Sequence, residues 1–522
     1  MKLPQVIAVC GGILLAGVAV HGAEPSLQVT TKAGLVQGKF QGNVRAFLGI
    51  PYAAPPVGAL RWQPPQPAAK WDGVRMATEF GPRPMQVVVW KDYVFRDAGY
   101  SEDCLTLNVW TPAKNATEKL PVMVWIHGGG LFAGGTSQQN FDGAHLAGRS
   151  VVVVSMNYRL GVFGYMTHPD LIAESPQNAA GNYGFLDQLA ALRWVQGNIA
   201  AFGGDPGNIT LFGESAGSAS VSAQMASPLA KGYFHKAIGE SGATGFTSDG
   251  LGQKPLASRA AEDAATLFNV TGAHTIAELR ALPALALLEA AEKAPNPMGI
   301  RFGAVVDGYF LPKTAAAIFA AGEQNDVPLL AGWNRDERGL ALGPTPPPIE
   351  AMQKTAREAF GENAAEFLRL YPSATPEQAA RSGAEFAADR FIAFGTWAWL
   401  EAQAKTGRSS VYRYRFERAP PTDFFGVARG SYHSADILYV FGSFDAQPQV
   451  PWTPTDREIS DRIQSYWTNF ARSGNPNGPG LPLWPAYAAK GDWPVMYLDT
   501  QSAAHADDFR ARDLFLERVW KK

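Results

Sequence analysis

The chain has 522 residues, of which 46% are hydrophobic and 18% are charged, and its formal net charge is −2. This composition excludes an intrinsically disordered chain, and the balanced charge gives no electrostatic reason to expect nucleic acid or an anionic membrane surface as a partner. A small, neutral or weakly polar substrate fits this balance better, and the sequence specifies no oligomeric state.

The first residues of the chain differ in character from the rest. Lys2 adds positive charge, residues 6–20 form an apolar run, and small residues lead up to Ala23. This layout predicts a signal peptide over residues 1–23 and a secreted or periplasmic protein. Cleavage after Gly22 and retention as an uncleaved anchor are the alternatives. After removal of the signal peptide we expect no stable membrane insertion.

Apolar runs and helical spacing alternate through the next part of the chain. Buried strands are predicted over Leu120–Ile126, Val151–Met156 and Ile209–Phe212. Between the last two, apolar residues recur at helical spacing from Phe185 to Phe202, and the glycine pair at 203–204 ends this helix. Strands that alternate with helices are typical of a parallel or mixed sheet covered by helices.

The second half of the chain continues the alternation less regularly. After Ser220 the sequence is rich in Ala and Leu, which predicts helical insertions that cover the sheet. Further strands are predicted over Val327–Gly332 and Val411–Phe416, and a helix over Asp456–Phe470. We therefore predict an α/β fold in which residues 24–522 form a single domain around a large, mixed and mostly parallel sheet.

A short glycine-flanked serine motif follows the third predicted strand. Residues 213–217 read Gly-Glu-Ser-Ala-Gly, and a helical stretch begins after them. A strand, a tight turn and a helix are the context in which this pattern forms a nucleophile elbow, because the strained turn exposes the serine hydroxyl. A purely structural turn is the alternative. The motif makes Ser215 the candidate nucleophile.

A second glycine-rich motif follows the first predicted strand. His127 is followed by three glycines, whose small size lets the backbone approach a substrate and point N–H groups at it. We predict an oxyanion hole formed by the N–H groups of Gly129, Gly130 and Ala216. A glycine run can also be structural, but its place after a buried strand and before the serine motif favours the catalytic interpretation.

At this point the chain resembles the type-B carboxylesterase family, which includes carboxylesterases and cholinesterases. The matching segments are Phe47–Ala53, Ser101–Val109, Gly181–Gln188, Trp194–Ile199 and Phe202–Pro206. The resemblance implies an α/β-hydrolase fold with helical insertions over the active site. It also implies a serine hydrolase that cleaves carboxylic esters through a Ser-Glu-His triad and an acyl-enzyme intermediate.

The resemblance also places the other two members of the triad. The acid falls on Glu337, which follows the strand predicted at 327–332, and Asp336 is the alternative because Arg338 stands where the family usually has glycine. The base falls on His433. The chain order of this fold, serine then acid then base, supports His433 independently, since His505 lies in a polar C-terminal stretch that favours a surface position.

Four further residues are candidates for contacts around the site. Glu214, beside the nucleophile, either tunes the field at the imidazolium or is a hydrogen-bonded buried carboxylate. Leu131 and Phe132 follow the oxyanion glycines and either line the acyl side of an apolar pocket or belong to the core. Ser241 resembles a family serine near the triad. We predict that Glu214, Leu131 and Phe132 contact the substrate.

The chain departs from the family at one covalent link. It contains only Cys10 and Cys104, and Pro84 stands where the family places the disulfide partner of the cysteine at 104. The loop between positions 84 and 104 is therefore not closed by a disulfide. Trp90 and Tyr93 lie in this loop but do not align with the aromatic residue that binds quaternary ammonium in cholinesterases, so a choline ester is not the expected substrate.

Three classes of function remain to be compared. Ester hydrolysis is the first, and an amidase or acyltransferase could form the same acyl-enzyme. A catalytically inactive binding protein on this fold would be expected to lose the serine, the acid or the base, and this chain keeps all three. The eight histidines are scattered without the spacing of metal ligands, so no metal or cofactor is predicted.

Overall fold

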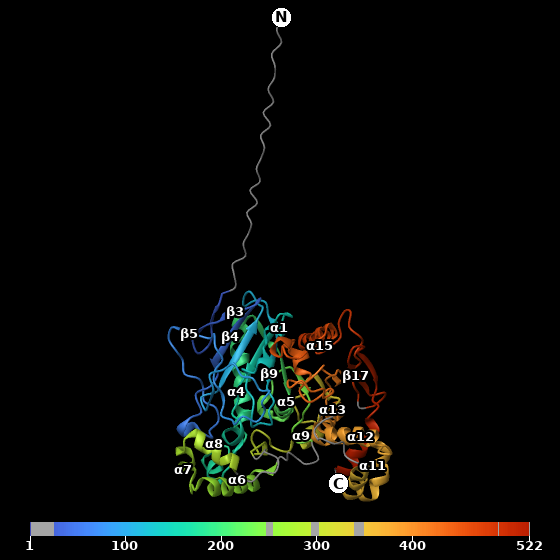
Figure 1. Ribbon diagram of the computed structural model, residues 1–522. Helices are drawn as coiled ribbons and strands as arrows, with labels where there is room; N and C mark the ends of the chain where they lie inside the picture. Colours follow the sequence, from blue (N-terminus) through green and yellow to red (C-terminus); the bar gives the residue numbers. More distant parts are fainter. Residues whose placement is uncertain (2–25, 247–253, 294–301, 339–348, 489, 521–522) are drawn as a thin grey trace.

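The computed structural model describes residues 1, 26–246, 254–293, 302–338, 349–488 and 490–520 (Figure 1). The predicted signal peptide at 1–23 lies outside these residues apart from Met1. Within the described part of the chain, no helix combines the length and the apolar character that crossing a membrane requires.

One large sheet forms the centre of the molecule. Its strand order across the sheet is β18 (Ala503–Ala506), β17 (Pro494–Leu498), β16 (Val411–Phe416), β15 (Leu329–Asn334), β12 (Lys236–Glu240), β11 (Gly204–Glu214), β9 (Leu120–Ile126), β10 (Val152–Met156), β8 (Thr106–Thr111), β4 (Val44–Pro51) and β3 (Lys39–Gln41). The strands from β10 to β17 are parallel, and the outer neighbours pair antiparallel. The predicted mixed, mostly parallel sheet is confirmed.

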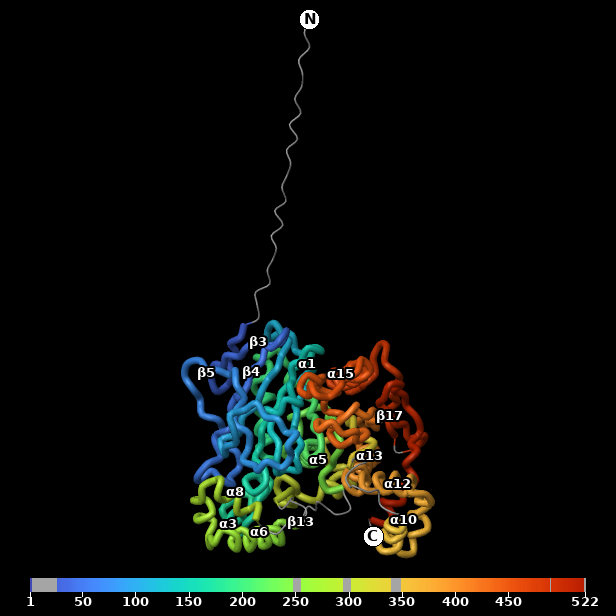
Figure 2. The backbone as a smooth tube through the Cα atoms, in the orientation of Figure 1, coloured from blue at the N-terminus to red at the C-terminus, as the bar shows by residue number. Residues whose placement is uncertain are grey.

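Short strands form smaller ladders beside the main sheet. They are β1 (Gln28–Thr30), β2 (Leu35–Gln37) and β5 (Val74–Met76) in one, β6 (Arg83–Pro84) and β7 (Tyr100–Ser101) in a second, and β13 (Lys254–Pro255) and β14 (Val305–Val306) in a third. The N-terminal strands lie at one edge of the main sheet and β17 and β18 at the other, which Figure 2 shows as blue and red chain on opposite sides.

Helices cover both faces of the sheet. In the described chain they are α1 (Ala144–Ala147), α2 (Gly161–Tyr165), α3 (Pro169–Glu174), α4 (Tyr183–Asn198), α5 (Ala216–Ala226), α6 (Leu256–Thr271), α7 (Ile276–Ala281), α8 (Ala284–Lys293), α9 (Ala315–Ala320), α10 (Ile349–Phe360), α11 (Ala364–Leu370), α12 (Pro376–Ala388), α13 (Phe394–Thr406), α14 (Ile437–Phe441), α15 (Pro454–Ser473) and α16 (Arg510–Trp520). Helices α4, α5 and α13 pack on one face of the central strands, and α1 and α15 pack on strands of the sheet from the other. In Figure 1, α6, α7 and α8 lie at the lower left of the molecule, and α11 and α12 lie at the lower right.

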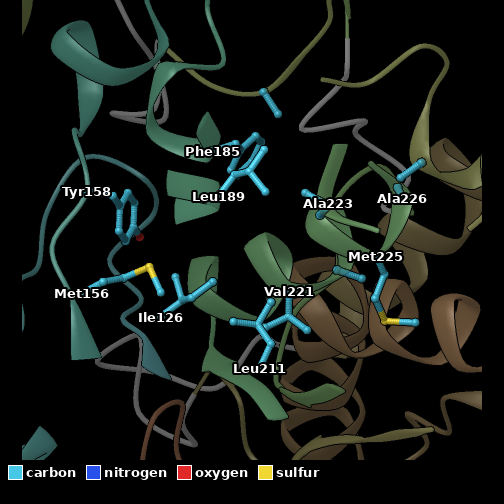
Figure 3. Close-up of a cluster of buried hydrophobic side chains, with 14 of the residues drawn as sticks. Ile126, Met156, Tyr158, Phe185, Leu189, Leu211, Val221, Ala223, Met225 and Ala226 are labelled. Atoms are coloured by element: carbon cyan, nitrogen blue, oxygen red, sulfur yellow. The ribbon is translucent and has the colours of Figure 1, made fainter. Parts of the chain in front are cut away.

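The alternation of side chains along β9 explains how one sheet supports two cores. Val122, Val124 and Ile126 are buried in the core that includes α4 and α5, whereas Met123 and Trp125 are buried in the core that includes α15. Successive side chains of a strand point to opposite faces, so a strand that is covered on both faces is apolar throughout. Figure 3 shows part of the first core, where side chains of the strands face those of the helices.

The predicted elements agree with the structure best near the serine motif. The strands predicted over Leu120–Ile126 and Val411–Phe416 are confirmed with the same bounds, and the helix predicted from Phe185 begins at Tyr183 and ends in a 3-10 turn. Gly203 stops it with φ of +84°, a backbone conformation that favours glycine. The helical region predicted after Ser220 also contains β12, a central strand of the sheet that the sequence did not predict.

Candidate active site

Ser215 lies on a sharp turn between β11 and α5. Its φ of 56° and ψ of −121° are strained for a residue with a side chain. The turn is tight enough that a Cβ on Gly213 would lie 2.6 Å from the Gly217 carbonyl carbon, and one on Gly217 would lie 2.0 Å from the Ile126 carbonyl oxygen. Only glycines fit at these two positions, which explains the motif and places the serine at the carboxyl end of β11.

Two hydrogen bonds connect Ser215 to an imidazole and a carboxylate. His433 Nε2 lies 2.9 Å from Ser215 Oγ, and His433 Nδ1 lies 2.5 Å from Glu337 Oε2. Glu337 follows β15, and His433 lies in the loop after β16, so parallel strands deliver all three side chains to the same edge of the sheet. The structure therefore brings together the three residues that the sequence proposed as a triad.

The second oxygen of Glu337 is held by neighbouring donors. Ser241 Oγ donates to Glu337 Oε1 at 2.5 Å, and the backbone N–H of Asn334 donates to the same oxygen at 2.7 Å. Asp336, the alternative acid, instead accepts a hydrogen bond from the N–H of Ser431 at 3.0 Å. The carboxylate beside the imidazole is therefore that of Glu337.

Glu214 is a second carboxyl group beside the imidazole. Its Oε1 lies 3.3 Å from His433 Nε2 and accepts a hydrogen bond of 2.6 Å from Ser434 Oγ. Burial alone would lower the pKa of His433, but the carboxylates of Glu214 and Glu337 outweigh this effect and raise it to about 9. Burial raises the pKa of Glu214 itself to about 8. The site is thus arranged to stabilise a positive imidazolium.

The glycine loop packs directly against the nucleophile. A Cβ on Gly128 would lie 3.1 Å from Ser215 Cβ, while Gly129 and Gly130 adopt φ of +103° and +64°. The N–H groups of Gly129, Gly130 and Ala216 donate no hydrogen bond to another described residue, and Ala216 begins helix α5. Free N–H groups next to a nucleophile are the donors that an oxyanion requires.

Two residues hold this loop in place from either side. Gln86 makes a pair of hydrogen bonds with Gly134, donating to its carbonyl at 2.6 Å and accepting from its N–H at 2.9 Å. Tyr158 donates to the carbonyl of His127 at 2.8 Å, and the two rings stack at 4.5 Å. Burial lowers the pKa of His127 to about 4, which favours the neutral imidazole.

Leu131 and Phe132 lie at the turn of the glycine loop and are half-buried. Leu131 has φ of 65°, and its carbonyl accepts from the N–H of Gly161 at 2.7 Å. The ring of Phe132 lies 5.6 Å from that of Trp90, which in turn lies 4.9 Å from Tyr93. A cavity of about 490 Å³ opens beside Trp90, Tyr93 and Ala133.

The loop that carries Trp90 lacks the disulfide of the family, as predicted. Cys104 is buried as a free thiol, and burial raises its pKa far above the usual range. Arg83 forms an ion pair with Asp97 at 2.5 Å within this loop, and Asp97 also accepts a hydrogen bond from Ser137. These polar contacts fasten the loop to the region that follows the oxyanion glycines.

No group of three or more potential metal ligands occurs among the residues that the structure describes. A serine hydroxyl in this geometry can act as a nucleophile, and the imidazole 2.9 Å away can accept its proton. Nucleophilic serines held on such a strand–helix elbow are characteristic of α/β-hydrolases, the class of protein that the fold and the site define.

The chain belongs to the carboxylesterase family, whose model matches residues 25–515. It is 36% identical to fumonisin B1 esterase of Sphingopyxis macrogoltabida over 493 residues, covering 91% of this chain and 87% of the relative. It is also 36% identical to carboxylesterase 1C of Rattus norvegicus, with 92% of each chain covered. The protein is thus a carboxylic ester hydrolase.

Solved structures support the same conclusion for the fold. A carboxylesterase of Geobacillus stearothermophilus matches with a TM-score of 0.79 and 33% identity, covering 95% of this chain and all 100% of that one. A PNB esterase matches with a TM-score of 0.79 and 33% identity, covering 93% and 98% of the two chains. The α/β-hydrolase fold implied by the sequence is confirmed.

Sequence reasoning missed two side chains that the structure places at the site. The ring of Phe391 contacts that of His433 with centroids 5.0 Å apart, and the guanidinium of Arg338 lies 4.4 Å from the centroid of the Phe391 ring. In the sequence, Arg338 stands out only as a departure from the family. No signal in the sequence connects Phe391 to the site, because it lies in a helical region far from every motif.

Proposed function

We propose that Ser215, His433 and Glu337 are the catalytic triad of this esterase. The observation that carries the proposal is the continuous pair of hydrogen bonds from Ser215 Oγ through the imidazole to Glu337. In this arrangement His433 accepts the serine proton as Oγ attacks the ester carbonyl. Glu337 holds the imidazole in the tautomer whose Nε2 is free to accept that proton.

The N–H groups of Gly129, Gly130 and Ala216 are the proposed donors to the carbonyl oxygen as it becomes negative. Loss of one such donor typically costs about 3 kcal/mol of transition-state stabilisation. His433 then passes the proton to the leaving alcohol, which leaves an acyl group on Ser215. Water, activated by the same imidazole, attacks the acyl-enzyme and releases the acid.

Glu214 adds to the stabilisation of the positive imidazolium that forms in both steps. We also propose that Leu131 and Phe132 contact the acyl side of the substrate, since both follow the oxyanion glycines and Phe132 borders the apolar loop around Trp90. The substrate is a small-molecule carboxylic ester. The names of the relatives, among them fumonisin B1 esterase and rat carboxylesterase 1C, indicate that different esters are accepted on this fold.

The proposed organisation of the chain is a signal peptide at 1–23 followed by one catalytic domain at 24–522. The apolar run at 6–20 and the family match that begins at residue 25 support this division. We accordingly propose that the protein is secreted or periplasmic. Comparison of the N-terminal residue of the exported protein with the sequence after Ala23 tests the proposal.

Three substitutions test the triad. We expect Ser215→Ala and His433→Ala to lower kcat for a neutral para-nitrophenyl ester by roughly 10⁴-fold or more, and Glu337→Gln by a similar order, because the three residues act as a unit. A fluorophosphonate should label the native protein but not Ser215→Ala. Persistent turnover in Ser215→Ala with an unchanged melting temperature would exclude this serine as the nucleophile.

A further inference from the structure

An aromatic ring and a guanidinium group are stacked beside the catalytic imidazole. The Phe391 ring meets the His433 ring nearly edge to face, with an interplanar angle of 75°. The guanidinium of Arg338 lies 4.4 Å from the centroid of the same Phe391 ring, within the range of a cation–π contact. A single phenyl ring therefore separates a fixed positive charge from the group that moves the proton.

The local backbone explains why this stack forms. Phe391 lies in η6 (Asp389–Ala393), a π-helical turn inserted between α12 and α13. Such turns redirect a side chain out of the regular helical spacing and are frequent at functional sites. Tyr371 anchors the turn by donating a hydrogen bond of 2.6 Å to Asp389. Arg338 directly follows the triad acid Glu337, so its position is fixed by the same loop.

The charge of Arg338 is available to a ligand. The residue is exposed, and it forms no ion pair with a carboxylate among the residues that the structure describes. Neighbouring arginines are already paired: Arg335 with Glu417 at 3.2 Å and Arg381 with Glu385 at 2.6 Å. The side chain of His433 is 23% exposed, so the imidazole and the stack beside it are open to solvent.

The interior of the site disfavours an anionic group of the substrate. Glu214 and Glu337 are buried beside His433, and a further carboxylate there would be repelled by both. An anionic group on the substrate must therefore stay outside the imidazole, where the Arg338 guanidinium lies. A guanidinium that contacts a ring face keeps N–H groups available for a two-point contact with a carboxylate.

We infer that Arg338 selects esters that carry a free carboxylate in addition to the ester bond. This inference rests on the proposed triad and adds a substrate class to it. The overall charge of −2 describes the whole surface and does not oppose a local positive group at the entrance. The ester is thus positioned with its carbonyl at Ser215 and its free carboxylate at Arg338, one ring away from His433.

Matched pairs of substrates test the inference in the full-length protein. On the acyl side, para-nitrophenyl hemiglutarate is compared with para-nitrophenyl butyrate. On the alcohol side, para-butyryloxybenzoate is compared with its methyl ester. For Arg338→Gln we expect the anionic-to-neutral ratio of kcat/KM to fall about tenfold in at least one pair, mainly through a higher KM, because a charge-assisted contact is lost. The affected pair identifies which side of the ester carries the carboxylate.

A control substitution removes the same charge from the segment that carries Phe391. Arg390 is exposed and adjacent to Phe391, but its guanidinium lies over Phe386, at 5.9 Å from that ring. Arg390→Gln should keep the native ratio, and Arg338→Lys should retain part of it. Raising the salt concentration should lower the ratio of the native enzyme but not that of Arg338→Gln.

Active-site titration with a fluorophosphonate corrects every rate for the fraction of folded enzyme. If Arg338→Gln leaves both ratios unchanged, or lowers the anionic and neutral rates equally, then Arg338 has only a structural role and the inference is wrong. Failure of the proposed triad gives a different result, namely turnover of the neutral ester that survives Ser215→Ala. The two outcomes are therefore distinguishable.

Discussion

The charge at His433 is set by two carboxylates rather than one. Glu337 contacts Nδ1 at 2.5 Å, and Glu214 lies 3.3 Å from Nε2, the nitrogen that must accept the serine proton. Both carboxylates favour the protonated imidazole, which raises the pKa of His433 to about 9 although burial opposes this. The same field that stabilises the imidazolium in the transition state thus makes the resting base harder to deprotonate.

A pH profile tests this balance. Because the base form of His433 is required for attack, kcat/KM should rise with pH through a midpoint well above the usual histidine value of about 6.5. Glu214→Gln removes a negative charge, lowers the pKa of His433 and should move this limb toward lower pH by about one unit or more. The profile is measured with a neutral ester.

The control for the pH profile is Glu323→Gln, which removes the same charge from an exposed ion pair with Lys313. It should leave the midpoint where it is in the native enzyme. If Glu214→Gln leaves the midpoint of the kcat/KM profile unchanged, or moves it to higher pH, then Glu214 does not act on the imidazole.

At the scale of elements, the oxyanion loop depends on the absence of side chains. An added Cβ on Gly129 would lie 2.0 Å from the carbonyl oxygen of Ala133, and the φ of +103° disfavours any other residue. We expect Gly129→Ala to displace the loop and to lower kcat by roughly 10²- to 10³-fold, since the N–H donors no longer meet the oxyanion. Steady-state kinetics with a neutral ester provide the measurement.

Gly73 offers a matched control because it also has positive φ, at +74°, but a Cβ added there would have no neighbouring atom within 4 Å. Gly73→Ala imposes a similar backbone strain at a position away from the oxyanion loop, and we expect its kcat to equal that of the native enzyme. If Gly129→Ala keeps native kcat as well, this loop does not hold the oxyanion.

The elements that could be predicted from the sequence are those with a local signal. The strand at Leu120–Ile126 is continuously apolar. The serine turn is specified by Gly213 and Gly217, where no side chain would fit. Strand β12 has no such signal, because Lys236 and Glu240 at its ends are polar. Its position in the centre of the sheet depends on pairing with β11 and β15, which only the tertiary structure provides.

At the scale of the molecule, one buried ion pair joins the N-terminal region to the helical insertions. Arg61 contacts Glu102 through two hydrogen bonds of 2.7 and 2.6 Å. It also donates to the carbonyls of Leu279, Arg280 and Leu282 around the end of α7. The contact of Arg61 with the insertion could not be predicted, since the sequence does not show which segment covers this residue.

Replacement of Arg61 should destabilise the whole protein. Arg61→Met leaves the Glu102 carboxylate without its partner, and breaking a buried pair in this way costs about 3–5 kcal/mol. The melting temperature is therefore expected to fall by several degrees. Lys313→Met, which breaks the half-exposed pair with Glu323, should cost less than about 1 kcal/mol. Equal shifts for the two variants would mean that Arg61 does not connect these regions.

The triad was proposed from chain order and motifs and stays a prediction, whereas the side chains around it carry no such signal. The order serine, acid, base leaves few candidates in a chain with eight histidines. Phe391, Gln86 and Trp90 reach the site from segments without a motif, and their positions depend on how the insertions and the unstapled loop pack. We expect substrate specificity to depend on these segments, so the sequence alone does not indicate the acyl group or the alcohol group of the ester.

The most direct test of the proposed chemistry is to identify the residue that carries the acyl group. The enzyme is mixed with a slowly deacylating ester, quenched in acid and digested, and the peptides are analysed by mass spectrometry. We predict one acyl adduct, on Ser215, which accumulates in native enzyme and is missing from Ser215→Ala. An adduct on another residue, or turnover of the same ester without any acyl-enzyme, would contradict the assignment of Ser215 as the nucleophile.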